Sequence, residues 1–294
     1  MSTQRSVKYL LVAACGAALA FPTASTFAQV TPKSDTTVAP EKKEGEAPTP
    51  TKPGKDTYMG VASAIEMVSS VTTSGVPIAE WQAAGKKTAV EVPMDRKIAK
   101  DGETALLLGV KVSDGVVASY AKDNQTVSRM APTVMRMAEA LGAKKEDMEE
   151  ALTISKALLE GNVFTIVNKL NTLAVAVQAN MEDGTAEDKA LANLIAVAGY
   201  FQGLRTTAYV LSEDKNYTAE RTNVFRQENT LKAIMERINA LPDNLKKLPT
   251  VVTITEQVPV LSAVMAGKGK DATFSKADVL KIKDATDKVI ATIK

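Results

Sequence analysis

The sequence predicts an all-α protein: an antiparallel bundle of about eight or nine helices, preceded by a signal peptide and a disordered linker. Helix-start signals recur along residues 57–294, and each is followed by apolar residues three and four positions apart. Strand signals are scarce, because residues 251–255 form the one notable β-branched run, which suits either extended chain or a helix start. We expect three segments: a signal peptide at 1–28, a linker at 29–56 and a single helical domain at 57–294.

The N-terminal segment has the layout of a bacterial secretory signal peptide. Arg5 and Lys8 form a short cationic start, and the apolar run at residues 10–21 is too short for a bilayer, which needs roughly 20 residues. Thr26 and Ala28 then place small residues at the positions that signal peptidase reads. We expect cleavage after Ala28 and a periplasmic or secreted mature chain.

Cys15 offers an alternative to soluble export. Residues 12–15, Val-Ala-Ala-Cys, resemble the lipobox at which bacterial lipoproteins are cut and acylated, and Gly16 after the cysteine suits this motif. The apolar run continues beyond Cys15, and the apolar stretch before it is unusually short, which favours cleavage after Ala28. The alternative is a lipoprotein anchored at Cys15, and apart from that lipid anchor no insertion of the mature chain into a membrane is expected.

The linker at residues 29–56 consists mainly of Pro, Thr, Lys and Glu. It has almost nothing to bury, so it cannot offset the entropy of ordering. The chain has 36 basic and 34 acidic residues, and cleavage removes two of the basic ones, so the mature form carries no net charge. Proteins that bind nucleic acid are usually basic because they neutralise phosphates. A nucleic-acid partner is therefore not expected.

Capping residues divide the helical domain. Residues 75–100 show the weakest pattern, and Trp81 is expected to anchor them against the bundle. Pro132 should kink or divide the helix that contains it. The remaining helices are expected at 101–122, 124–141 (ending at Gly142), 144–160 (ending at Gly161), 163–181 (capped by Asn162), 185–211 (opened by Thr185) and after Thr218 and Ser275.

Two segments are apolar on nearly every face, residues 106–120 and 191–211. A helix of this kind belongs in the middle of a bundle. Gly199 and Gly203, four residues apart in the second segment, would let another helix approach closely. We therefore expect these two helices to form the centre of the domain.

The chain has no histidine and one cysteine, which excludes Ser-His-Asp catalysis, imidazole metal sites, zinc knuckles and iron–sulfur centres. No cofactor and no metal are expected. Two Ser-x-x-Lys motifs, at 119–122 and 212–215, fall at helix ends without the companion motifs of penicillin-recognising enzymes. Met130 and Met137 share a face typical of a core rather than of a copper site. The acids of residues 182–188 are expected to cap a helix rather than to bind calcium.

Two charges lie inside the apolar faces of the central helices: Asp114 in the first and Arg205 in the second. A buried charge must find a counter-charge, a hydrogen-bonding network or a ligand. The simplest hypothesis pairs Asp114 with Arg205 across the two helices, assisted by Gln202 or Tyr209. The alternative is a polar ligand site built from the same four residues.

These observations predict an exported, non-catalytic α-helical module of the bacterial cell envelope. It would have a structural role or bind a partner protein, an envelope component or a small apolar ligand. The alternative is a histidine-free enzyme that uses carboxylates to act on envelope glycans or peptides. A clustered pair of acids in a cleft, one of them with a raised pKa, would favour the enzyme.

Overall fold

The structure is a computed structural model that describes residues 61–93, 95–152, 163–266, 268 and 273–293. The predicted signal peptide, the linker and Cys15 lie outside these residues. Within them every regular element is helical, which confirms the all-α prediction. The elements are α2 (Val61–Thr73), α3 (Ile78–Thr88), α4 (Gly102–Tyr120), α5 (Asn124–Ala140), α6 (Lys145–Leu152), α8 (Val163–Glu182), α9 (Ala186–Glu213), η1 (Ala219–Phe225), α10 (Glu228–Asn239), α11 (Asp243–Lys246), α12 (Pro249–Met265) and α13 (Lys276–Ile290).

The described residues contain more helices than the expected eight or nine. Residues 75–100, where the pattern is weak, include α3, and its Trp81 is fully buried, as predicted. The four-residue α11 is too short to leave a periodic signal. The β-branched run at 251–255 is helical and forms the first half of α12. Tertiary packing of the inner face of α12 overrides the weak helix propensity of these residues.

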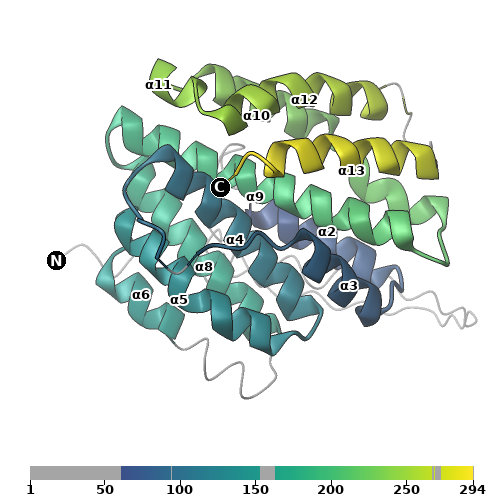
Figure 1. The fold of residues 1–294 in the computed structure, drawn as a ribbon, viewed down its shortest axis with the longest axis horizontal. Coiled ribbons are helices and arrows are strands. Elements are labelled where there is room, and N and C mark those ends of the chain that lie inside the picture. Colours follow the sequence, from purple (N-terminus) through teal and green to yellow (C-terminus); the bar gives the residue numbers. More distant parts are fainter. Residues whose placement is uncertain (1–60, 94, 153–162, 267, 269–272, 294) are drawn as a thin grey trace, which may run out of the picture. The chain divides into compact units, whose positions relative to one another are not determined.

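The centre of the bundle is formed by α4 and α9, the two helices predicted to be central (Figure 1). Nearly all residues of α4 and most residues of α9 are buried. The two helices approach very closely at Gly109, where an added Cβ would lie 2.1 Å from the Ile195 carbonyl oxygen and 2.9 Å from the Gly199 nitrogen. Gly203 makes a second close approach, to Ala64 of α2. The glycines therefore set the spacing of the core.

The outer helices are arranged around this central pair. α2, α3, α5 and α8 pack against α4, and α2, α3, α8 and α13 pack against α9. α12 lies further out and packs against α10, α11 and α13 (Figure 1). The candidate site described below depends on this order, because α3, α4, α9 and α13 all contribute to it.

Four of the described helices, α4, α5, α9 and α13, begin at a side-chain N-cap. The capping boxes of Thr185 and Ser275 are both formed. α5 begins at Asn124, as expected, and Asp123 is its N-cap. α5 runs through Pro132 without being divided, and Pro132 is exposed, away from the packed side of the helix. The segment after Thr218 forms a 3-10 helix, and the expected helix at 144–160 is described only to Leu152.

Candidate functional site

Asp114 is buried in the middle of α4 and has three donors. Its Oδ2 accepts hydrogen bonds from Lys111 Nζ at 2.8 Å and from Val90 N at 3.2 Å. Its Oδ1 accepts from Gln202 Nε2 at 2.6 Å. The predicted direct pair between Asp114 and Arg205 is therefore wrong. Lys111, one turn earlier on the same helix, supplies the counter-charge instead, and Gln202 is a further donor to Asp114.

Arg205 of α9 pairs with the last helix of the chain. Its Nε donates to Asp287 Oδ1 at 2.6 Å, and Tyr209 Oη donates to Asp287 Oδ2 at 3.1 Å. The side chains of Arg205 and Asp287 are 15% and 27% exposed, so this pair lies near the surface, whereas Asp114 is in the interior. The difference in depth is why the two predicted partners do not meet.

The two pairs nevertheless belong to one network, because both reach the end of α3. The Thr88 carbonyl oxygen accepts from Gln202 Nε2 at 2.9 Å and from an Arg205 guanidinium nitrogen at 2.7 Å. Two residues further on, the Val90 carbonyl oxygen accepts from Lys111 Nζ at 2.8 Å. We call this set the α3 anchor: Thr88, Val90, Lys111, Asp114, Gln202, Arg205, Tyr209 and Asp287. Its geometry fastens the end of α3 to both central helices and to α13.

The outer end of the α3 anchor combines an aromatic ring with two cations. Lys283 Nζ lies 4.5 Å from the centroid of the Tyr209 ring, and the Arg205 guanidinium carbon lies 5.6 Å from it. Lys283 Nζ is also 3.2 Å from Asp287 Oδ2. Although burial opposes the charged ammonium, the hydrogen bond and attraction to Asp287 raise the pKa of Lys283. The outer end of the α3 anchor is therefore stabilised by the attraction of Lys283 and Arg205 to Asp287.

A second ionisable cluster joins α3 to the end of α9. Asp214 is buried, pairs with Arg221 and accepts a hydrogen bond from Asn216 N at 2.8 Å. Burial and the charge of Asp214 raise the pKa of Glu80, whereas Arg221 and Lys215 oppose that rise. This pair of acids was not foreseen from the sequence, because its members are 134 positions apart. Only the fold brings them together.

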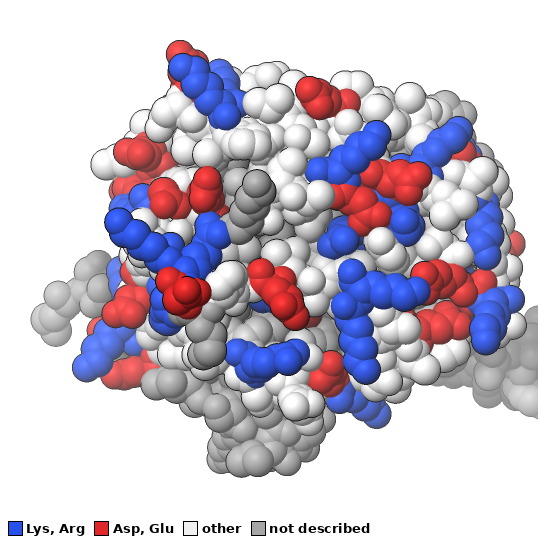
Figure 2. All heavy atoms as spheres, in the orientation of Figure 1, with Lys and Arg blue, Asp and Glu red and all other residues white. Residues whose placement is uncertain are grey.

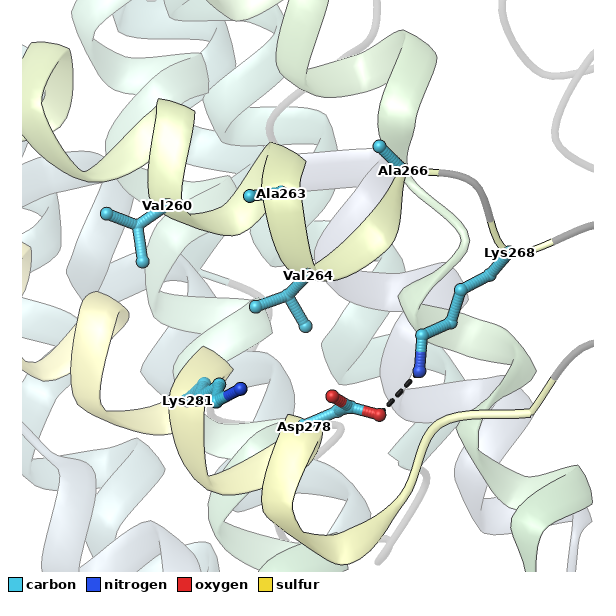
Figure 3. Close-up of a pocket in the computed structure, with 7 residues that line it drawn as sticks. All are labelled: Val260, Ala263, Val264, Ala266, Lys268, Asp278 and Lys281. Carbon is cyan, nitrogen blue, oxygen red and sulfur yellow. Dashed lines mark hydrogen bonds and ion pairs between the residues drawn. The ribbon is translucent and has the colours of Figure 1, made fainter.

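An apolar hollow of about 450 Å³ lies between α12 and α13 (Figure 3). Its walls are Val260, Ala263, Val264 and Ala266 on one side and Asp278 and Lys281 on the other, with Lys268 at one end. Lys268 Nζ lies 2.5 Å from Asp278 Oδ2 and holds the pKa of Asp278 low, at about 2. Lys281 is exposed and makes no ion pair with any other described residue.

The other motifs noted in the sequence serve the fold. Ser119 and Ser212 each donate to a carbonyl oxygen of their own helix, at 2.7 and 2.9 Å. Met130 and Met137 are buried in the core. Asp188 forms the capping box of α9 and pairs with Lys100, whose hydrogen bond lowers the pKa of Asp188 to about 2.

Over the described part of the chain, no group of three or more acidic or cysteine side chains is placed to hold a metal ion. Within the same residues no helix has the length and hydropathy needed to cross a membrane. Comparison of the chain with protein-family models, with curated proteins and with solved structures finds no match in any of the three.

Proposed function

We propose that this chain is an exported, non-catalytic α-helical module of the bacterial cell envelope that works by binding or by a structural role. Export is supported by the N-terminal sequence, with cleavage after Ala28 and, as the alternative form, a lipid anchor on Cys15. The partner is an envelope protein or a small ligand. Nucleic acid is not expected, because the mature chain has no excess of positive charge.

The observation that carries this proposal is that the charged and amide side chains of the α3 anchor form their hydrogen bonds within the protein. Asp114 has three donors, and Lys111, Gln202 and Arg205 bond either to a carboxylate or to a backbone carbonyl oxygen of residues 88–90. Catalytic groups, in contrast, must keep an atom directed at a substrate. None of the anchor residues lines the hollow between α12 and α13 or a second hollow of about 480 Å³ beside Arg136 of α5. These side chains hold helices together.

The alternative function, a carboxylate-dependent enzyme, is favoured by one observation. Glu80 and Asp214 form a clustered pair of acids, and the pKa of Glu80 is raised. Such a pair can divide the roles of acid and base. Against this function, Asp214 is fastened by Arg221 and its side chain is fully buried, so it cannot touch a substrate in this conformation.

Two measurements on the exported chain test the proposal. In-cell crosslinking followed by mass spectrometry should recover a specific envelope partner whose crosslinks map to one surface. Incubation with purified peptidoglycan should release no soluble fragments. Release of fragments by the wild-type chain, together with its loss in Glu80→Gln, would replace the binding function with the enzymatic one. An Asp284→Asn variant, which changes an acid that is 68% exposed, is the matched control.

A further inference from the structure

The outer face of α12 is unusual for an exposed helix surface. From Val252 to the C-cap Ala266, its exposed residues include one charge, and the rest are apolar or uncharged: Val252, Thr255, Glu256, Pro259, Val260, Ala263 and Ala266. We call these seven residues the α12 face. The neighbouring α13 has a similar length, and four of its exposed residues are charged. Figure 2 shows the upper edge, where Figure 1 places α10, α11 and α12, with white surface between separate blue and red groups.

The opposite face of α12 is mainly apolar, although it also buries Thr250 and Gln257. Val251, Ile254, Val258 and Leu261 are buried against the neighbouring helices. A contiguous patch of exposed apolar residues marks an interaction surface. Two of the four large apolar side chains that are most exposed in the described residues, Val252 and Val260, belong to this face. No helix among the described residues covers it.

The charges next to the α12 face have opposite signs at its two halves. Glu256 lies in the first half and makes no ion pair with any other described residue. Lys281 lies beside the second half, where it borders the hollow together with Val260 and Val264. Glu256 belongs to α12 and Lys281 to α13, so the surface formed by both helices is complementary to a copy of itself that runs in the opposite direction, because each acid then meets a base.

The spacing of the apolar residues fits the same arrangement. Val252 and Glu256 are four residues apart, as are Val260 and Val264, so each pair spans about 6 Å along the helix. A two-fold axis close to Val258 places Val252 of one copy opposite Val264, over the hollow of the other. The same axis places Glu256 opposite Val260, beside Lys281. One rotation therefore satisfies both the apolar and the charged contacts.

We propose that the α12 face is the interface of a symmetric homodimer, in which Val252 fills the hollow of the second copy and Glu256 pairs with its Lys281. Each contact occurs twice, as two-fold symmetry requires. α12 has 17 residues and is about 25 Å long, so the interface is small. Small interfaces are weak and transient, and we expect a concentration-dependent equilibrium between monomer and dimer. The inference goes beyond the proposed function and does not depend on export.

Sedimentation velocity of the processed chain, from about 5 to 500 µM to bracket a weak interface, tests the dimer. The wild type should change from monomer to dimer within this range. Val252→Asp should weaken the association at least tenfold. Its matched control is Ile78→Asp on α3, where the side chain is 40% exposed compared with 45% for Val252, and this variant should dimerise normally. Thermal unfolding should be unchanged in both, since both side chains are on the surface.

Charge reversal tests the pairing itself. Glu256→Lys and Lys281→Glu should each remain monomeric, whereas an equimolar mixture of the two should form a heterodimer with wild-type affinity. A chain that stays monomeric at every concentration overturns the proposal. It is also overturned if the dimer persists in Val252→Asp, if the mixture fails to associate, or if a different protein occupies the α12 face while the chain itself is monomeric.

Discussion

Replacing Asp114 by alanine should be among the most destabilising single changes in the described domain. Asp114 is the counter-charge of Lys111, and both side chains are at least 90% buried. Without Asp114, an ammonium group stays in the interior with the Val90 carbonyl oxygen as its remaining partner. Removal of one member of a buried ion pair typically costs about 3–5 kcal/mol. For a domain of this size, that loss lowers the melting temperature by roughly 6–20 °C.

A double-mutant cycle separates the pair from its surroundings. Lys111→Met removes the positive charge and keeps the apolar stem, so Lys111→Met with Asp114→Ala leaves no uncompensated charge. The double variant should therefore lose much less stability than the two single variants together, with a coupling of about 2–3 kcal/mol. A second cycle, between Asp114 and Arg205, should show less coupling. These two residues have no hydrogen-bond partner in common and are connected only indirectly, through Gln202 and the Thr88 carbonyl oxygen.

Urea unfolding, followed by far-UV circular dichroism and by the fluorescence of Trp81, measures these effects. Trp81 is the one tryptophan of the chain and is fully buried, so its emission reports on the region beside the α3 anchor. Asp284→Asn serves as the control and should change the free energy of unfolding by less than about 0.5 kcal/mol. A loss below 1 kcal/mol for Asp114→Ala, or additive losses in the Lys111 cycle, would refute the reasoning from the buried pair.

Three further predictions concern packing and pH. Gly109→Ala should destabilise the domain by about 3 kcal/mol or more in urea unfolding, because the added Cβ would collide with backbone atoms of α9. The control is Gly85→Ala, which should be neutral or stabilising, because the nearest atom to its added Cβ is 3.4 Å away. The pKa of Asp278 is lowered to about 2. The contribution of Asp278 to stability is therefore complete above about pH 4 and is lost as the pH falls to about 2. Asp278→Asn should flatten this part of the plot of stability against pH. The pKa of Glu80 is raised by burial and by Asp214, so the folded state binds the Glu80 proton more tightly than the unfolded state does. The contribution of Glu80 to stability therefore falls as the pH rises. Glu80→Gln should raise the melting temperature at pH 7, and a decrease would contradict the raised pKa.

Much of the fold could be predicted because local signals and burial agree. The capping boxes of Thr185 and Ser275 mark helix starts through side chains three residues apart, which need no tertiary information. The all-round apolar composition of α4 and α9 is the direct consequence of being surrounded by other helices. The helix over residues 251–255 was harder to predict, since its β-branched residues are stabilised by packing rather than by propensity.

The sequence predicts several residues of the candidate site, but it does not predict which of them bond to each other. A helical wheel shows that Asp114 is buried, yet it does not show how deep a residue of another helix lies. Arg205 reaches outward to Asp287, a partner 82 positions away, and that contact depends on where α13 packs. Lys111 was within reach of sequence reasoning, because an oppositely charged residue one helical turn away is a local signal. The pair of Glu80 and Asp214 had no such signal.

The measurement that tests the proposed function most directly is the intact mass of the protein in fractions of the native host. We predict that the chain is recovered outside the cytoplasm and begins at Gln29, after cleavage at Ala28. A chain that begins at an acylated Cys15 in the membrane fraction would select the lipoprotein form of the same exported module. An unprocessed chain that begins at Met1 in the cytoplasm would contradict the proposal, because a module of the cell envelope has to leave that compartment.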